Sequence, residues 1–278
     1  MKSTELLYGT TAGRWFLSQI MKRHWDRLAV DFLCSPLSKP MVSWYVHKHH
    51  VLLTAAQERS YRTFRDFFAR TREEGFLDVT PEHLISPCDG WLSVFHIDDH
   101  SVFHIKNSHY RIGDLVQEEA LARNYSGGIC LIFRLCPQDY HHYCYIDDGF
   151  QGTYHYIPGA LHSVQPIACE TYPVYTLNRR CWSLLTTEHF GPVVWTEIGA
   201  LIVGGIHNEH ENQRVTKGME KGHFELAGST IVLLFEKDKI EILPELLTAL
   251  SEKPEVRVRQ GQKLGTAAAP RGSRESDE

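Results

Sequence analysis

Hydrophobic positions recur with a helical spacing over the first 76 residues. Apolar side chains appear there every three or four positions, which predicts amphipathic helices. The first such stripe consists of Leu17, Met21, Trp25, Leu28 and Phe32. Pro36 and Pro40 interrupt it, and a second helical stretch follows. That stretch ends in one aromatic stripe, expected to be core, of Tyr61, Phe64, Phe67 and Phe68. Arg65 and Arg70 beside it are expected to be solvated or to face an anion.

The spacing changes near residue 80, where short apolar runs begin, bounded by Gly, Pro, Asn and Asp. The runs are Trp91–Ile97, Ser101–Ile105, Ile129–Leu135, Gly152–Ile157, Val193–Val203 and a pair around Ser229. Short strands separated by turn signals predict an antiparallel sheet or a barrel-like body. We therefore predict an α+β fold with a helical region over 1–76 and a β-rich body over 77–260. Residues 261–278 are mostly Ala, Gly, Ser, Arg and acidic residues and are expected to be a disordered tail.

Composition argues against a nucleic-acid-binding protein, a zinc-stabilised fold and a membrane-spanning protein. The 278 residues are 42% hydrophobic and carry a net charge of −5, so no positive field favours nucleic acid. Seven cysteines without a CxxC pair indicate a reducing compartment and no structural zinc site. We expect no signal peptide and no membrane-spanning helix, hence a soluble or peripheral protein. The stripe beginning at Leu17 mixes Trp with basic residues, which suits either core packing or a membrane interface.

The stretch from Lys217 to Lys237 contains the most unusual junction in the chain. It predicts a strand, a tight turn at Gly228-Ser229 and a fully apolar second strand. Gly228 has no Cβ, so its carbonyl is open to close approach by the Ser229 hydroxyl. A self-cleaving serine and a simple turn whose hydroxyls cap the backbone both fit this pattern.

Other residues could assist such a serine. Asp89 lies in a Pro-Cys-Asp-Gly turn, and His141 and His142 lie in a loop rich in His, Tyr and Asp. Adjacent residues of an extended segment point to opposite faces, so one of these histidines can face a site. His162 is a further candidate. An Asp–His–Ser relay, in which Asp orients His and His deprotonates Ser, would join these signals.

The chain resembles the phosphatidylserine decarboxylase proenzyme family. Matching segments occur in the family's order between roughly residues 60 and 240, and the ordered set is specific although no single segment is. The segments are Phe67-Phe68-Ala69-Arg70, Ser86-Pro87-Cys88-Asp89-Gly90, Ile105-Lys106 before His109-Tyr110, Phe133-Arg134-Leu135 before Asp139-Tyr140-His141, Asn178 with Arg180, Ile198 to Gly204, and Lys217-Gly218 through Gly222-His223-Phe224 to Gly228-Ser229-Thr230.

The resemblance implies a pyruvoyl enzyme. Ser229 would attack the Gly228 carbonyl in an N-to-O acyl shift, and elimination and hydrolysis would leave a covalent pyruvoyl group and ammonia. The products would be a β chain, residues 1–228, and an α chain, residues 229–278. The pyruvoyl group would form a Schiff base with the substrate amine and accept the electrons released with CO₂. Asp89 would orient the base for self-cleavage, and His141 would be the base or a proton donor.

The resemblance also implies a setting and a substrate. The enzyme would convert phosphatidylserine to phosphatidylethanolamine at an anionic membrane surface, as a peripheral protein on the cytoplasmic side. The amino-terminal helical region would contact the lipid. No metal is expected, and the sequence leaves open whether the protein is a homo-oligomer.

The chain departs from the family pattern at two places. Many members carry a second histidine three residues after the first in the Tyr-His loop, where this chain has Cys144. Either His141 does both jobs, or His162, and next His142, replaces the missing base. An Asn-Glu-Arg motif is Asn178-Arg179-Arg180 here, so a carboxylate is absent.

Two other functions stay open. The same pyruvoyl chemistry could act on a free amino acid, for example an aromatic one, because catalysis resides in the terminus and specificity in the pocket. A non-catalytic β-rich binding module would instead keep an intact chain.

Overall fold

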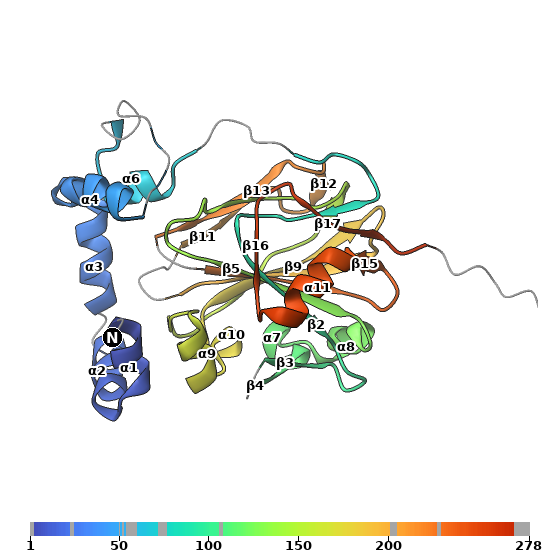
Figure 1. Cartoon of the computed structure of the whole chain (residues 1–278), viewed down its shortest axis with the longest axis horizontal. Helices are drawn as coiled ribbons and strands as arrows, with labels where there is room; N and C mark the ends of the chain where they lie inside the picture. Colours follow the sequence, from blue (N-terminus) through green and yellow to red (C-terminus); the bar gives the residue numbers. More distant parts are fainter. Residues whose placement is uncertain are drawn as a thin grey trace, which may run out of the picture.

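The computed structural model describes residues 3–22, 25–49, 51, 53, 60–71, 77–105, 108–200, 205–226 and 229–269. Helices dominate the described part of the first 71 residues. They are α1 (Ser3–Gly9), α2 (Thr11–Lys22), α3 (Trp25–Cys34), η1 (Pro36–Ser38), α4 (Lys39–His49) and α6 (Phe64–Phe68). Figure 1 shows them as an arm along one side of a β-rich body. The predicted order, helices first and sheets after, is confirmed.

The last helix of the arm is fixed by a capping box and by aromatic packing. The Thr63 hydroxyl accepts a hydrogen bond from the Asp66 N–H at 3.0 Å, and the Asp66 carboxylate accepts one from the Thr63 N–H at 3.1 Å. The helix then buries its aromatic stripe, as predicted. This arm cluster consists of Val42, Tyr45, Val46, Phe64, Phe67, Phe68 and Leu226.

The arm exposes many other large apolar side chains. They are Leu6, Trp15, Phe16, Leu28, Phe32, Leu37 and Trp44. Leu28 and Phe32 belong to the predicted amphipathic stripe and are 67% and 43% exposed. This described part of the stripe therefore does not pack on the core. No helix within the described ranges is long and apolar enough to cross a bilayer.

The body is built from antiparallel strands with short helices between them. Its strands are β1 (His83–Ile85), β2 (Gly90–His96), β3 (Val102–Ile105), β4 (Ser108–Arg111), β5 (Ile129–Leu135), β6 (His142–Cys144), β7 (Gly149–Gln151), β8 (His155–Ile157), β9 (Arg180–Thr187), β10 (Pro192–Ile198), β11 (Gly205–Asn208), β12 (Gln213–Val215), β13 (Glu220–Glu225), β14 (Ser229–Phe235), β15 (Ile240–Ile242), β16 (Val256–Val258) and β17 (Lys263–Ala267). Its helices are α7 (Ile112–Val116), α8 (Glu119–Ala122), η2 (Arg123–Tyr125), α9 (Pro166–Thr171), α10 (Val174–Leu177) and α11 (Pro244–Glu252).

The largest sheet has nine strands in the order β12-β7-β9-β10-β14-β5-β2-β16, with β8 also on β9. The path ends at β12 and β16, so the described strands form an open sheet. Strand β14 lies inside it, paired antiparallel with β10 and with β5. All seven residues of β14 are buried, which explains its uninterrupted apolar sequence.

Two layers cover the two faces of this sheet. On one face, Val232 and Leu234 of β14 join a core cluster with residues of α7, α9 and α10. On the other face, Ile231 and Leu233 pack in a second cluster with Tyr143 of β6 and Phe224 of β13. Those two strands belong to a separate three-stranded sheet, β11-β13-β6.

The strands on either side of the Gly228-Ser229 junction, β13 and β14, are both present as predicted. They do not pair with each other, because β13 belongs to the three-stranded sheet and β14 to the nine-stranded one. The chain therefore crosses from one layer to the next between residues 226 and 229. Gly228 itself lies outside the described residues.

The expected disordered tail is wrong for residues 261–269. Lys263–Ala267 form β17, the middle strand of the sheet β1-β17-β15. Main-chain hydrogen bonds to two neighbours order this segment, and Leu264 supplies a buried apolar side chain. Residues 270–278 lie outside the described part of the chain. The other domain boundaries stay predictions.

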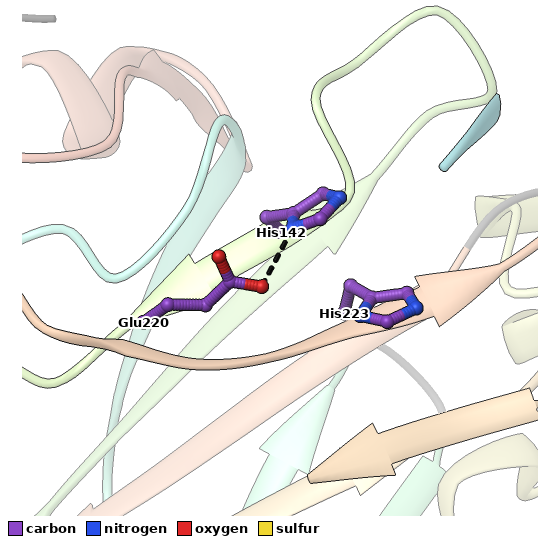
Figure 2. A group of neighbouring side chains, drawn as sticks. All are labelled: His142, Glu220 and His223. Atoms are coloured by element: carbon purple, nitrogen blue, oxygen red, sulfur yellow. Dashed lines mark hydrogen bonds and ion pairs between the residues drawn. The ribbon is translucent and has the colours of Figure 1, made fainter. Parts of the chain in front are cut away.

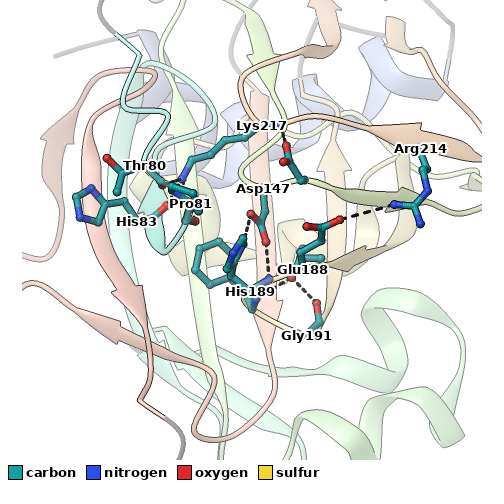
Figure 3. Close-up of polar contacts among 12 residues, drawn as sticks. Thr80, Pro81, His83, Asp147, Glu188, His189, Gly191, Arg214 and Lys217 are labelled. Atoms are coloured by element: carbon teal, nitrogen blue, oxygen red, sulfur yellow. Dashed lines mark hydrogen bonds and ion pairs between the residues drawn. The ribbon is translucent and has the colours of Figure 1, made fainter.

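Several polar residues of the His-rich loop have structural partners (Figure 3). Asp147 accepts hydrogen bonds from the His189 backbone N–H at 2.8 Å and ring Nδ1 at 2.9 Å. Asp148 accepts one from the Lys217 N–H at 2.7 Å. The Lys217 ammonium donates to the carbonyls of Thr80, Pro81 and His83. These acidic residues are thus engaged in joining loops of the body.

Candidate functional site

Ser229 is the first residue of β14 and is fully buried. The strand register puts the neighbouring Thr230 opposite Arg134 of β5, and Arg134 opposite Trp91 of β2. One residue earlier in β14, Ser229 pairs with Leu135 of β5. Gly90 of β2 lies on the other side of Leu135. Because adjacent strands lie about 4.8 Å apart, Gly90 and Ser229 are separated by about 10 Å across the sheet.

Asp89 directly precedes Gly90, so Asp89 and Ser229 lie at the same end of the sheet. Gly90 permits this, since a Cβ there would meet the Arg134 carbonyl oxygen at 3.0 Å. The Asp89 carboxylate accepts a hydrogen bond from the Gln260 N–H at 2.9 Å. The Gln260 side chain donates to the Pro87 carbonyl at 3.1 Å and lies 3.4 Å from the His142 carbonyl. Gln260 therefore ties the Asp89 turn to the histidine loop.

His141 is fully buried between that loop and the arm. Its ring packs on Phe68 with centroids 4.0 Å apart. Its Nδ1 lies 2.9 Å from the Asp139 carbonyl oxygen, which can only accept, so Nδ1 carries the proton. Nε2 then carries a lone pair and no proton, and it has no hydrogen-bond partner among the described residues. Burial lowers the His141 pKa to about 3, so the ring is neutral near pH 7.

An ion pair links the surroundings of Asp89 and His141. Arg257 donates to Asp139 at 2.5 Å, and the other Asp139 oxygen accepts from the Cys136 N–H at 2.7 Å. The hydrogen bond to Asp139 and the charges of Asp139 and Asp89 raise the Arg257 pKa. Sequence reasoning missed Arg257 and Gln260, because both follow β14 in a region without a recognised motif.

Arg70 is not the solvated or anion-facing charge that the sequence suggested. It is 9% exposed and points at main-chain carbonyls of the histidine loop, those of Gln138 at 3.4 Å and Asp139 at 3.3 Å. Its guanidinium also lies 4.8 Å from the centroid of the Phe67 ring. Arg70 thus fastens the arm to the loop that carries His141.

Cys144, the departure in the Tyr-His loop, is 3% exposed. Its backbone N–H donates to the Pro87 carbonyl at 2.9 Å, beside the Asp89 turn. The neighbouring Cys88 is fully buried, and burial raises its thiol pKa well above the usual value. None of the seven cysteines forms a disulfide.

His162 lies in a different environment. Its ring stacks on Tyr172 with centroids 4.7 Å apart, and Asn178 hydrogen-bonds both its backbone N–H and its carbonyl at 2.8 Å. Burial lowers the His162 pKa, and its Nδ1 has no partner in the described part of the chain. The hydrogen bonds and ring contacts of His162 thus involve Asn178, Tyr172 and Tyr8.

Asn178 and Arg180 organise the backbone near this end of the sheet. The Asn178 amide bridges the carbonyls of His162 and Gly199 at 2.8 and 2.7 Å. The Arg180 guanidinium is 2% exposed and donates four hydrogen bonds to carbonyl oxygens. Its acceptors belong to Asp114, Leu115, Thr176 and Asn178. These matched residues hold the ends of β9 and β10.

Leu226, three residues before Ser229, has a strained backbone. Its φ is +54°, a left-handed conformation that is uncommon for a bulky side chain. The side chain is buried in the arm cluster with Phe64, Phe67 and Phe68. The arm therefore packs directly against the layer crossing that leads to Ser229.

The structure also gathers potential metal ligands that sequence spacing did not reveal. His142, Glu220 and His223 form one group, shown in Figure 2, and His207, His223 and Glu225 form a second. The ligands of each group come from two strands. His142 of β6 and Glu220 of β13, for example, contact each other although they are 78 positions apart in the sequence. A local motif search cannot find such a set.

Ser229 is a buried hydroxyl at the first position of a central strand, and Asp89 lies at the same end of that sheet. A hydroxyl of this kind is a candidate nucleophile if a base can reach it. The family model for phosphatidylserine decarboxylase matches residues 64–266. A phosphatidylserine decarboxylase proenzyme 2 of Clostridium acetobutylicum is 39% identical over 94% of this chain and 90% of that protein. Phosphatidylserine decarboxylase proenzymes of Clostridium perfringens and Ruminiclostridium cellulolyticum are 35% and 34% identical, over 93% of this chain and 90% and 89% of theirs.

The chain belongs to the phosphatidylserine decarboxylase family, a family of carboxy-lyases. The family resemblance drawn from the ordered segments is confirmed. The match to the family model includes Asp89, His141, His162 and Ser229.

Proposed function

We propose that the protein is a self-processing pyruvoyl-dependent decarboxylase that converts phosphatidylserine to phosphatidylethanolamine and CO₂. The observation that carries this proposal is Ser229, buried at the first position of the central strand, directly after the crossing between two sheets. The names of the relatives supply the substrate and the precursor form.

Processing needs residues of this chain and one water molecule. The Ser229 hydroxyl would attack the Gly228 carbonyl and move the preceding chain from the amide nitrogen to the serine oxygen. Loss of the Ser229 α proton would then expel residues 1–228 as a carboxylate and leave dehydroalanine. Water would hydrolyse the dehydroalanine to a pyruvoyl group and release ammonia.

His141 is the histidine best suited to take a proton in this process. It is neutral, and the lone pair on its Nε2 is buried without a partner in the described structure. Asp89 would act as a positioning residue through Gln260 and through the Arg257–Asp139 pair that borders the histidine loop. His162 is connected to Asn178 and Tyr172 instead, so we do not favour it as the substitute base.

Backbone strain at Leu226 would favour cleavage of the nearby Gly228–Ser229 bond. A bulky residue in a left-handed conformation costs on the order of 1–3 kcal/mol and persists only when its surroundings enforce it. Here packing in the arm cluster holds Leu226 in this conformation. Cleavage between residues 228 and 229 would remove the covalent link from Leu226 to β14, so the strained backbone at Leu226 could relax.

The residues of the site fit the pyruvoyl group as the new terminus of the α chain. Strand β14 stays paired on both sides, so the first residue keeps its place without the preceding chain. The His141 Nε2 and the Thr230 hydroxyl are buried polar groups without partners in the described structure, which leaves both able to bind substrate atoms. The pyruvoyl group would supply the electron sink that decarboxylation of an amine-bearing acid requires.

The exposed apolar side chains of the arm would bring the site to a lipid substrate. Trp15 and Phe16 on α2 are 65% and 47% exposed, and Lys48 on α4 lies 4.3 Å from the exposed Trp44 ring. Aromatic side chains beside a cation suit the headgroup region of an anionic bilayer. The arm would thus be the contact with the membrane surface.

The experiment is a decarboxylation assay with purified protein on phosphatidylserine vesicles, free serine and free aromatic amino acids. Ser229→Ala is the matched control, because it removes only the nucleophile. We expect phosphatidylethanolamine from the vesicles with the wild type alone. Turnover of a free amino acid without turnover of the vesicles would assign the substrate to the alternative class, and no turnover with an intact chain would favour a binding module.

A further inference from the structure

Three side chains converge on the outer surface of β6 and β13. The register puts His142 directly opposite His223, and their rings stack with centroids 4.8 Å apart. Glu220 reaches the same point from the other end of β13, as Figure 2 shows. One ligand atom from each residue lies within 4.8 Å of the other two. Two imidazoles and one carboxylate form a common set of zinc ligands.

His142 has an acceptor oxygen beside each of its ring nitrogens. Nε2 lies 3.2 Å from the Ala69 carbonyl oxygen, and Nδ1 lies 2.7 Å from Glu220 Oε1. A neutral imidazole has a single N–H, so it can donate to only one of them. With the proton on Nε2, the Nδ1 lone pair and the carboxylate face the same point, where a second proton or a bound cation would satisfy both. A histidine whose second nitrogen donates to a carbonyl is the usual arrangement of a metal ligand.

His223 offers a second ligand atom at the same point. It is half buried, and its Nδ1 has no partner in the described structure. A ring nitrogen of neutral imidazole without a hydrogen-bond partner can coordinate a metal ion.

The neighbouring group of His207, His223 and Glu225 is a weaker candidate. Glu225 already pairs with the Arg65 guanidinium and with His207 Nε2, the latter at 2.8 Å. Its negative charge is thereby compensated within the protein. Glu220 pairs with His142 among the described residues, and its side chain is 44% exposed, so an ion from solvent can reach it.

We propose that His142, Glu220 and His223 bind a divalent transition-metal ion of the Zn²⁺ class, with an open coordination position toward solvent. The ion would clamp β6 to β13. Because His142 also bonds the carbonyl of Ala69, the residue that ends α6, the ion would fasten the helical arm to the body. This proposal is independent of the decarboxylase activity.

The test is titration of metal-stripped full-length protein, without a polyhistidine tag, with Zn²⁺. Calorimetry should give one strong site per chain, and the unfolding temperature should rise with free Zn²⁺ because the ion binds the folded state. Glu220→Gln and His223→Gln should each weaken binding by about 10–100-fold or more, since even outer partners of a metal site have effects of that size. His155→Gln, which removes an exposed histidine elsewhere, should bind as the wild type does.

Two results would overturn the proposal. One is unchanged affinity in both Glu220→Gln and His223→Gln, with circular dichroism showing that the variants are folded. The other comes from Co²⁺, whose absorption should indicate nitrogen and oxygen ligands in wild type. A thiolate charge-transfer band that persists in the two variants would instead place the ion on cysteine.

Discussion

The buried polar groups near Ser229 divide into two kinds. Arg180 is satisfied by four carbonyl acceptors, and Arg70 by carbonyls of the histidine loop and of α6. His141 Nε2 and the Thr230 hydroxyl are buried without partners in the described structure. Most buried polar atoms in native proteins are hydrogen-bonded. Thr230 directly follows the candidate nucleophile Ser229 in β14, and His141 lies in the loop that Gln260 joins to Asp89, so both exceptions belong to the proposed site.

His141 predicts how stability depends on pH. Its pKa is about 3 in the folded protein and near 6.5 when exposed, so between those values only the unfolded chain takes up this proton. The free energy of unfolding should therefore decrease as pH falls from about 6.5 toward 3. In the uncleaved Ser229→Ala chain, urea unfolding should show a weaker pH dependence after His141→Gln. The same substitution at exposed His100 should leave the dependence unchanged, and equal slopes in all three proteins would contradict the buried neutral ring.

Asp89 predicts an effect on maturation. Asp89→Asn keeps the size of the side chain but removes its charge from the vicinity of Arg257. We expect self-cleavage to slow by about tenfold or more, because a misplaced base loses much of a 10²–10⁴-fold contribution. The half-time of chain separation after synthesis measures this on a denaturing gel, with exposed Asp99→Asn as the control. Equal half-times for both variants would remove Asp89 from the relay.

At the scale of single residues, the sequence suggested Ser229 and Asp89 as site residues but not the hydrogen-bond network around Asp89. Ser229 and Asp89 stand in local motifs, whereas Arg257 and Gln260 reach the site only because β16 pairs with β2. The partner of each histidine could not be read from the spacing either. His141 and His142 are adjacent in sequence, yet one contacts Phe68 and the other Glu220.

Among the elements, the crossing from β13 to β14 has the most direct link to function. Leu226→Gly would permit the +54° φ without strain, whereas Leu226→Ala would keep the strain and lose similar apolar contacts. If strain assists cleavage, the glycine variant should mature more slowly than the alanine variant. Chain separation in a matched time course measures the difference, and an equally fast or faster glycine variant would show that strain plays no part.

The helical arm predicts a second effect at this scale. Trp15→Ala with Phe16→Ala should weaken binding to anionic vesicles by about tenfold or more, because burying one large apolar side chain contributes about 1.5–3 kcal/mol. Vesicle co-sedimentation measures the binding. Phe150→Ala is the matched control, since Phe150 is 46% exposed on β7 of the body. Equal loss in the control, or none in the double variant, would place the membrane contact elsewhere.

Element types were more predictable than their arrangement. Helical and alternating spacings predicted the helices of the arm and the strands β2, β3, β5, β8, β10, β13 and β14, because these periods follow from local geometry. The shorter strands and the helices of the body were not predicted. The layer crossing between β13 and β14 depends on which sheet each strand joins, and strand pairing is set by distant residues. The misassigned tail has the same cause: β17 is short, Leu264 is its only large apolar residue, and the strands that pair with it are the distant β1 and β15.

For the whole molecule, the packing of β14 fits the proposed cleavage of the Gly228–Ser229 bond. Strand β14 is enclosed by both core clusters and paired on both edges, so it stays in place whether or not the preceding chain is attached. The arm contacts the crossing through Leu226 and the histidine loop through Arg70. A precursor that cleaves at this bond can therefore keep its fold.

The most direct test is the intact mass of the purified protein under denaturing conditions, with and without borohydride. Wild type should separate into residues 1–228 and 229–278, and the shorter chain should gain two hydrogen atoms on reduction of its pyruvoyl ketone. Ser229→Ala should give one chain of 32.0 kDa. An unbroken wild-type chain, or normal cleavage of Ser229→Ala, would contradict self-processing at Ser229.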